Sequence, residues 1–309
     1  MTSSFAEYRP DRLHAGIDLT TGGRTGVPVW AAGDGFLSRV RVSPYGYGKS
    51  LYLKLRDGRT VVYAHLSRFT DDLDRYVLEE QYSRKSYSLN LYPRPNQFSV
   101  SRGALVGYSG RTGIGNPHLH VEIRDREGRP TSPLHNGFLL DDRRPPRITH
   151  LAVIPLSASS RVNGRSRLAV IRLKQRDGVW TTDQIPRVWG PIALSAKPDE
   201  RSHHANYRLG VYSRRLMLDG VPVFNSTYDR FEWPTQHHSN FDLDFTLMAR
   251  GLGRFLVMSI SSGNRLRFYG DKVTSAGVIH AGVAEAAHPV TPWPPGEHSA
   301  ELTFGDFAG

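Results

Sequence analysis

Short runs in which apolar and polar residues alternate, bounded by Gly, Pro, Asn or Asp, recur along almost the whole chain. An alternation with a period of two is typical of β-strands with one buried face. In the first half of the chain these runs are Gly35–Val42, Ser50–Leu55, Arg59–His65 and Leu119–Ile123. Helical spacing of apolar residues is found in one segment, Asp71–Tyr82. We therefore expect an all-β protein with a single plausible helix.

The length of 309 residues is enough for two domains, and a charged segment with two prolines marks the expected boundary. This segment, DDRRPPR at residues 141–147, cannot continue a β-ladder or a helix through its prolines. The strand-like runs that follow it are Thr149–Pro155, Arg167–Leu173, Gly210–Leu218 and Arg254–Ser259. We predict a first domain over residues 1–145 and a second domain, a β-sandwich of short strands, over residues 146–309.

Composition excludes several classes of protein and of site. The chain has no cysteine, which excludes disulfides, thiolate zinc sites and cysteine nucleophiles, so a metal here must be bound by His, Asp or Glu. No apolar run approaches the roughly 20 residues that cross a bilayer, and we expect no transmembrane segment. The net charge of +11 attracts polyanions, and only six of the 40 basic residues are Lys. The arginines are scattered without a dense tract, so we expect no specific nucleic-acid partner.

Five side chains suited to metal binding or acid–base chemistry lie at three places in the first 120 residues. They are His14 and Asp18 in HAGID, His65 at the end of VVYAH, and His118 and His120 in HLH. Histidines two residues apart on a strand point to the same face, so the HLH pair can share one metal site. The set His14, Asp18 and His120 leaves a tetrahedral Zn²⁺ one open position, which is the mark of a catalytic site. Water in that position has its pKa lowered to about 7.

The residues alone leave the general base open. The helix-borne HExxH motif is absent, so the glutamate base of many metalloproteases is missing. His65 and His118 remain as candidates, either as the general base toward water or as the group that stabilises the oxyanion. Trp30, Tyr45 and Tyr47 are aromatic residues that either line a groove beside the site or serve core packing and turns.

Three blocks of the chain resemble the lysostaphin/LytM-type zinc endopeptidases, a family of peptidoglycan metallopeptidases. The blocks are HAGIDLTTGGRTGVPVWAAGDG, VVYAHLSRF and VGYSGRTGIGNPHLHVEIRD, within residues 5–135. The resemblance implies that His14, Asp18 and His120 hold one zinc ion per chain, and that His65 and His118 are the catalytic pair. It also implies an antiparallel β-sheet that carries a narrow groove, and peptide cross-links of peptidoglycan as the substrate. No ligand position is substituted, so we expect an active enzyme.

The resemblance also has implications for where the protein is located and for the second half of the chain. It implies a cell-envelope protein, periplasmic or secreted, although MTSSFAEYRPDRLHAG has no export signal. The closeness of His14 to residue 1 favours a shortened chain over a cytoplasmic protein. The segments PPRITHLAVIPL, GVYSRRLMLDGVPVF and YDRFEW resemble an immunoglobulin-like β-sandwich appended to envelope-located members of the family. Such a domain implies docking to an envelope partner or presentation of substrate, and a passive spacer is the alternative.

Two features leave the specificity and the activity open. The segment Arg68–Val100, between the second and third blocks, is longer than in minimal members of the family and is long enough to wall the groove and alter specificity. A non-enzymatic module that binds wall peptides or regulates an amidase is one alternative function. Degenerate members of that class typically lose zinc ligands, which this chain keeps. The other alternative function is a zinc peptidase that acts on a protein substrate. Its catalytic groups would be the same as those of a peptidoglycan peptidase.

Overall fold

Strands dominate the computed structural model, which describes residues 1–10, 12–113, 115–139, 144–202, 207–270, 276–282 and 293–307. The predicted all-β class is confirmed. The chain divides into two compact units: unit 1 comprises Met1–Ala6 and His14–Leu140, and unit 2 comprises Glu7–Leu13 and Asp141–Gly309. The predicted boundary between residues 145 and 146 stays a prediction, because residues 140–143 of the linking segment lie outside the described residues. Among the described residues, no helix is both long and apolar enough to cross a membrane.

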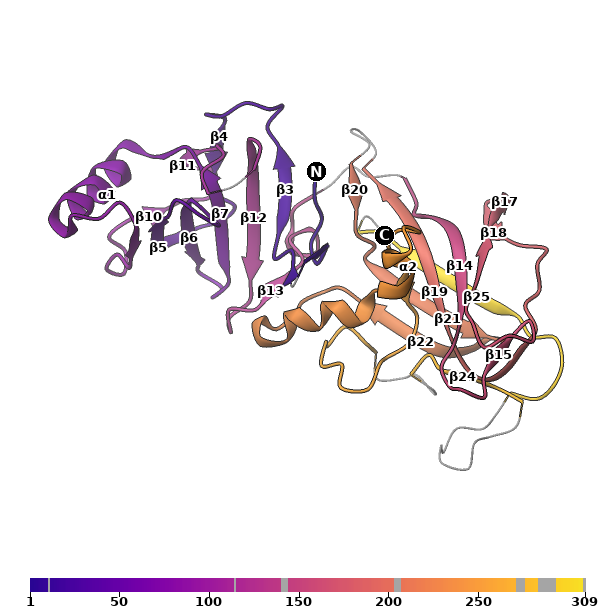
Figure 1. Cartoon of the computed structure of the whole chain (residues 1–309). Helices are drawn as coiled ribbons and strands as arrows, with labels where there is room; N and C mark the ends of the chain where they lie inside the picture. The colour runs from indigo at the N-terminus through magenta and orange to yellow at the C-terminus, as the bar shows by residue number, and fades with distance from the viewer. Residues whose placement is uncertain are drawn as a thin grey trace. The chain divides into compact units, whose positions relative to one another are not determined.

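Unit 1 is built on an antiparallel sheet in which β12 lies beside both β3 and β7 (Figure 1). The order along the sheet is β10-β5-β6-β7-β12-β13, with β3 also paired to β12 and β9 also paired to β5. The strands are β3 (Ile17–Thr20), β5 (Gly35–Val42), β6 (Lys49–Leu55), β7 (Thr60–Leu66), β9 (Leu89–Leu91), β10 (Ser99–Val100), β12 (His118–Arg124) and β13 (Pro130–Thr131). The four strand-like runs predicted in this half correspond to β5, β6, β7 and β12.

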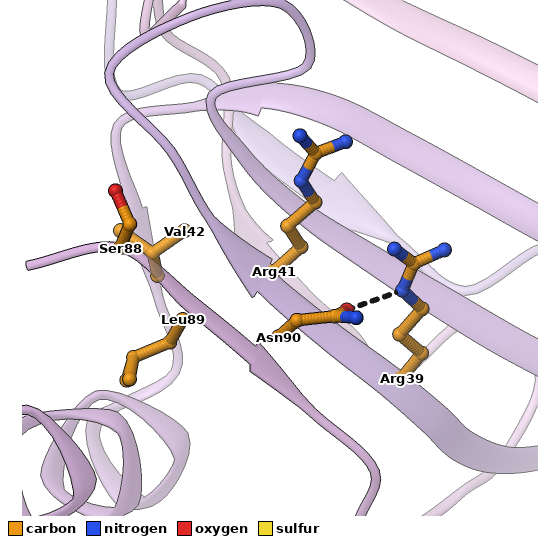
Figure 2. A pocket seen from close by; sticks show the side chains of 6 residues that line it. All are labelled: Arg39, Arg41, Val42, Ser88, Leu89 and Asn90. Atoms are coloured by element: carbon orange, nitrogen blue, oxygen red, sulfur yellow. Dashed lines mark hydrogen bonds between the residues drawn. The ribbon is translucent and has the colours of Figure 1, made fainter. Parts of the chain in front are cut away.

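The two faces of this sheet differ in character because side chains alternate along each strand. Leu51, Val61 and Val121 on one face are fully buried. The opposite face carries the polar residues of β12 together with Arg39 and Arg41 of β5, which Figure 2 shows projecting from the same strand. One face therefore forms the core, and the other carries the polar and charged side chains.

Smaller elements complete unit 1. A second sheet has the order β4-β11-β8, formed by β4 (Pro28–Trp30), β11 (Leu105–Tyr108) and β8 (Arg68–Phe69). The predicted helix is found as α1 (Asp71–Arg84), which begins at the expected residue and ends two residues later. It buries Leu73 and Val77 and ends at Lys85, which has the left-handed conformation of a helix C-terminus. A short 3₁₀ helix, η1 (Leu134–Asn136), follows β13.

Unit 2 contains two larger sheets that share one apolar core. The first has the order β15-β19-β14-β16, with β20, β23 and β24 also paired to β19, and the second has the order β22-β21-β25. Buried residues of both sheets, including Val153, Leu194, Leu216 and Phe224, form a single cluster. The strands are β14 (Arg147–Pro155), β15 (Arg161–Val162), β16 (Ala169–Arg172), β19 (Val188–Arg201), β20 (Arg208–Leu209), β21 (Ser213–Leu218), β22 (Val221–Thr227), β23 (Leu256–Val257), β24 (Ile279–Ala281) and β25 (Ala300–Gly305). The immunoglobulin-like topology stays a prediction.

Helical elements in unit 2 depart from the sequence expectation. A 3₁₀ helix, η2 (Trp233–Asp242), begins with a proline in its first turn, and α2 (Phe245–Ala249) follows it. The Asp244 side chain caps α2 by accepting a hydrogen bond from the Leu247 amide at 3.0 Å. A five-residue helix is too short to produce a helical repeat in the sequence. Two short hairpins complete the unit: β1 (Tyr8–Arg9) with β2 (Arg12–Leu13), and β17 (Lys174–Arg176) with β18 (Val179–Thr181).

Candidate metal centre

Strand pairing brings Asp18 and His120 together, although they lie 102 positions apart in the sequence. Strands β3 and β12 are antiparallel, and Asp18 lies directly opposite His120. Side chains of directly opposed residues project from the same face of a sheet. Gly16 makes this approach possible, since a Cβ at that position would lie 2.1 Å from the Val121 carbonyl oxygen. The motif HAGID therefore needs its glycine between the two potential ligands.

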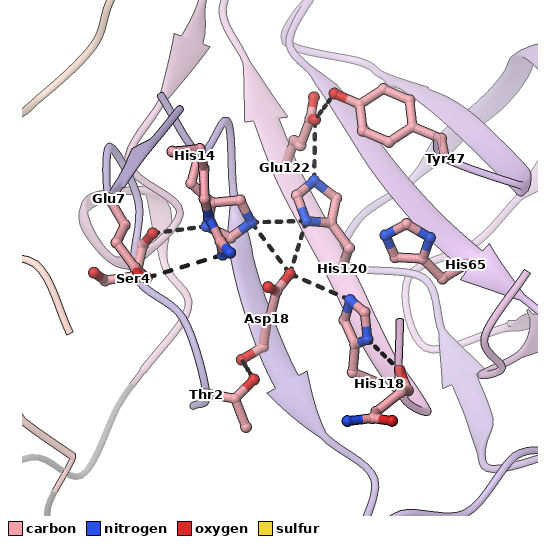
Figure 3. Close-up of polar contacts among 12 residues, drawn as sticks. Thr2, Ser4, Glu7, His14, Asp18, Tyr47, His65, His118, His120 and Glu122 are labelled. Atoms are coloured by element: carbon pink, nitrogen blue, oxygen red, sulfur yellow. Dashed lines mark hydrogen bonds and ion pairs between the residues drawn. The ribbon is translucent and has the colours of Figure 1, made fainter. Parts of the chain in front are cut away.

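Three ligand-type atoms converge on one point of this face (Figure 3). His14 Nε2 lies 3.0 Å from His120 Nδ1, and Asp18 Oδ1 lies 2.8 Å from His120 Nδ1 and 3.2 Å from His14 Nε2. Zinc with ligands at about 2.0–2.1 Å in tetrahedral geometry requires ligand separations of about 3.3 Å. Two imidazole nitrogens and one carboxylate oxygen at these separations fit a zinc ion. The structure thus brings together the three predicted ligands.

The second nitrogen of each of these imidazoles is held by a hydrogen bond. His14 Nδ1 lies 2.7 Å from the Ser4 carbonyl oxygen, and His120 Nε2 lies 3.1 Å from Glu122 Oε1. Both partners are acceptors, so the bonded nitrogen carries the proton and the opposite nitrogen presents its lone pair to the centre. This arrangement fixes the orientation that a metal ligand requires.

Glu122 contacts the candidate site, and the sequence reasoning missed it. Its side chain is fully buried, accepts a hydrogen bond from the Tyr47 hydroxyl, and pairs with Arg124 through two contacts at 2.7 and 2.8 Å. Burial alone would raise the pKa of Glu122, but the hydrogen bond from His120 and the charge of Arg124 outweigh it and lower that pKa to about 2. The motif HLHVE could have identified Glu122, because residues 118, 120 and 122 of a strand point to the same face.

The sequence left the roles of three aromatic residues open, and the structure distinguishes one of them from the other two. The Tyr47 ring is stacked on the His120 ring at 5.6 Å between centroids, and Tyr47 also bonds to Glu122. Tyr45 and Trp30 are exposed, so Trp30 does not serve core packing. Tyr47 therefore supports a ligand and its carboxylate partner.

The polar contacts within the cluster lower the pKa of Asp18 and raise the pKa of His120. Burial alone would raise the pKa of Asp18, but hydrogen bonds from His120 and His14 outweigh it and hold that pKa well below its usual range. Burial alone would lower the pKa of His120, but hydrogen bonds to Asp18 and Glu122 raise it to about 9. The two carboxylates thus favour positive charge at the centre, and a proton and a metal ion compete for the same nitrogen.

His65 and His118, the predicted catalytic pair, lie next to the three ligands. Their ring centroids are 4.7 Å apart, and His118 Nε2 lies 3.6 Å from Asp18 Oδ1. His65 Nδ1 bonds to the Thr112 carbonyl oxygen at 2.9 Å and His118 Nδ1 to that of Asn116 at 2.6 Å. Each bond leaves Nε2 of that imidazole as the nitrogen with a lone pair.

The backbone at His65 is held in an uncommon conformation. Its φ is 60°, in the left-handed region that non-glycine residues rarely adopt, and such a residue persists only where its surroundings impose the conformation. The Gly-rich turn before β12 provides part of those surroundings. Gly110 of this turn approaches so closely that a Cβ would lie 2.8 Å from the His65 carbonyl oxygen. Burial lowers the pKa of His65 to about 4, although the bond to Thr112 opposes this, so its imidazole is neutral at pH 7.

Replacement of Glu122 by glutamine is expected to weaken zinc binding about 10- to 100-fold, since the charge that orients His120 is removed while its shape is kept. Competition with a fluorescent zinc chelator measures the affinity. Glu127→Gln is the matched control, because Glu127 is an exposed carboxylate paired with Arg129 at 2.8 Å. Equal affinities of the two variants would show that Glu122 has no part in metal binding.

The fold and this cluster together define a β-rich protein with a candidate metal centre, and comparisons with known proteins refine that class. No protein-family model matches the chain. The chain is 31% identical over 124 residues to the DD-carboxypeptidase/endopeptidase Mpg of Neisseria meningitidis serogroup B and to that of Neisseria gonorrhoeae. The match covers 40% of this chain and 22% of either relative. The chain thus spans about a fifth of the length of the curated relatives it matches.

Solved structures of peptidases are also similar to part of the chain. The catalytic domain of the prophage-encoded M23 protein EnpA from Enterococcus faecalis is 25% identical and covers 44% of this chain and 89% of its own, with a TM-score of 0.31. The catalytic domain of lysostaphin from Staphylococcus simulans is 22% identical. The match covers 43% of this chain and 87% of that domain, with a TM-score of 0.31. The curated relatives are named DD-carboxypeptidase/endopeptidase, and the predicted resemblance to lysostaphin/LytM-type peptidases is confirmed.

Proposed function

We propose that this protein is a zinc-dependent metalloendopeptidase that hydrolyses peptide cross-links of bacterial peptidoglycan. The observation that carries the proposal is the convergence of His14 Nε2, Asp18 Oδ1 and His120 Nδ1 to within 2.8–3.2 Å of one another, with two further imidazoles beside them. These three residues would hold one zinc ion per chain. A bound zinc ion supplies Lewis acidity that polarises a peptide carbonyl and acidifies water.

His65 and His118 provide the proton transfers of this reaction. The Nδ1 atom of each is held by a backbone carbonyl oxygen, so Nε2 can accept a proton from the attacking water. The same nitrogen can then return the proton to the leaving amine, which is general base followed by general acid catalysis. His65 is neutral at pH 7 because burial lowers its pKa to about 4, so its lone pair is free at neutral pH.

The substrate class follows from the relatives and from the ligand set. The curated relatives are named DD-carboxypeptidase/endopeptidase, which supports wall peptides as the substrate and the cell envelope as the place of action. All three ligand positions are filled by residues that bind metal, which favours an enzyme over a wall-peptide-binding or amidase-regulating module. Unit 2 would dock the enzyme to an envelope partner or present the substrate.

Zinc removal and restoration on purified sacculi test the proposed function. We expect release of wall peptides by the purified chain, loss of release after dialysis against 1,10-phenanthroline, and recovery with one equivalent of zinc. Digestion of an unrelated unfolded protein is measured in a parallel assay. Cleavage of that protein would identify a peptidase that acts on proteins. Zinc binding without digestion of either substrate would contradict the enzymatic proposal and favour the binding module, and digestion of the protein alone would contradict the wall substrate.

A further inference from the structure

A row of directly paired residues runs across the polar face of the unit 1 sheet, away from the metal centre. Glu122 of β12 lies opposite Val62 of β7, Val62 lies opposite Tyr52 of β6, and Tyr52 lies opposite Arg39 of β5. Opposed residues share a face, so Arg39 projects on the same side of the sheet as Glu122 and His120. Neighbouring strands lie about 4.8 Å apart, so three steps place the β5 end of the row about 14 Å from β12.

The row ends at a shallow pocket with two guanidinium groups (Figure 2). Its volume is about 390 Å³, and it is lined by Arg39, Arg41, Val42, Ser88, Leu89 and Asn90. None of these lining residues is acidic, so the two positive charges are not neutralised within the pocket. The pocket is therefore suited to an anionic group.

The two arginines of this basic pocket differ in how they are held. Arg39 Nε donates a hydrogen bond to Asn90 Oδ1 at 2.6 Å, and the guanidinium lies over the Tyr52 ring at 4.7 Å. These contacts fix its orientation and leave its terminal nitrogens for a ligand. Within the part of the chain that the structure describes, the Arg41 guanidinium has no hydrogen-bond or ion-pair partner. Arg41 lines the pocket and is partly buried, and its charge is unpaired among the described residues.

One wall of the pocket comes from Arg68–Val100, the segment predicted from the sequence to alter specificity. This segment contributes β9, which pairs with β5 and places Asn90 opposite Arg41. Ser88 and Leu89 of the same segment also line the pocket. The insertion thus adds a strand beside β5 and converts the two arginines from an open sheet edge into a bounded pocket.

We infer that the pocket of Arg39 and Arg41 binds a carboxylate of the substrate peptide, at a distance from the bond that is cut. The inference rests on the proposed function, since it assigns a subsite to the same peptide. A guanidinium matches a carboxylate with two parallel hydrogen bonds, which a pair of arginines next to an aromatic ring can supply. An extended peptide advances about 3.3–3.6 Å per residue, so the separation of about 14 Å between β5 and β12 corresponds to about four residues.

Two synthetic cross-linked peptides test this subsite, one with a free carboxylate four residues from the scissile amide and one with that carboxylate as a primary amide. Binding is measured by calorimetry on the His118→Ala variant of the two-unit chain, which holds the peptide without turning it over. We expect about tenfold tighter binding of the carboxylate peptide, and loss of this preference when Arg41→Gln is added. In the otherwise wild-type enzyme, Arg41→Gln should raise KM for the carboxylate peptide and leave kcat unchanged.

Arg75→Gln is the matched control, because Arg75 is an exposed arginine on α1 and its replacement changes the net charge equally. The control should keep the preference for the carboxylate peptide. An unchanged preference in Arg41→Gln, or no preference in the parent variant, would overturn the inference. If the preference depends on Arg41 but the wild-type enzyme cuts neither peptide, the subsite stands and the proposed activity is wrong.

Discussion

Replacement of His120 by alanine is expected to abolish zinc binding and hydrolysis together, whereas replacement of His118 should abolish hydrolysis alone. His120 Nδ1 is one of three converging ligand atoms, and two protein ligands do not retain zinc in a site of this kind. His118 is not among those ligands, and its Nδ1 is bonded to a backbone carbonyl oxygen. Its loss should lower kcat about 10²- to 10⁴-fold, the usual contribution of a general acid–base group.

Elemental analysis of purified protein beside the sacculus digestion assay measures both effects. His135→Ala is the matched control, since His135 lies on η1 and does not belong to the ligand cluster of His14, Asp18 and His120. The control should keep one zinc per chain and full release of wall peptides. Equal zinc loss in His118→Ala and His120→Ala would contradict the division between ligand and catalytic residue.

Replacement of Asp242 by alanine is expected to destabilise unit 2 by about 3–5 kcal/mol, because it leaves a buried charge without its partner. Arg214 is fully buried and donates a hydrogen bond from Nη2 to Asp242 Oδ1 at 3.0 Å. The hydroxyls of Tyr228 and Tyr269 also donate to the two oxygens of Asp242. The single replacement therefore leaves two buried donors, from Arg214 and Tyr228, and the half-buried Tyr269 hydroxyl without their acceptor.

Calorimetric unfolding of the full chain measures this loss, and zinc content reports separately on unit 1. The matched control is Asp183→Ala, which breaks an exposed pair with Arg176 and should leave the unfolding temperature unchanged. The double replacement Arg214→Met/Asp242→Leu removes both charges and should recover part of the loss. A double variant that is as unstable as Asp242→Ala would show that the unpaired charge is not the cause.

Much of the fold could be predicted because period-two patterning is a local property of the sequence. Residues Gly35–Val42 were expected as a strand and form β5 with the same bounds, and α1 begins at the expected Asp71. Helix α2 and the 3₁₀ helix η2 were missed, since a proline start and a side-chain cap determine them instead of a periodic apolar stripe. The immunoglobulin-like topology predicted for the second domain stays a prediction, because patterning does not encode the order of distant strands.

The candidate site was foreseen in its residue types but not in its supporting contacts. Ordered motifs identified His14, Asp18 and His120, and the structure brings their ligand atoms together. Glu122 was not recognised as part of the site, and Tyr47 was left either to line a groove beside the site or to form a turn. Glu122 looks like an ordinary strand residue, and Tyr47 belongs to a loop 75 positions before it in the sequence, so only the tertiary structure reveals that they meet.

The sequence by itself determined the β-rich class, the absence of thiolate ligands and the set of residues able to bind a metal. Composition and strand periodicity are properties of the sequence that do not depend on tertiary contacts. Only the tertiary structure decided which atoms converge. The register of β3 against β12 sets Asp18 opposite His120, and the pairing of β9 with β5 places Asn90 beside Arg41. Both are long-range pairings that depend on packing of the whole sheet, and a one-residue slip in either would turn these side chains to the opposite face.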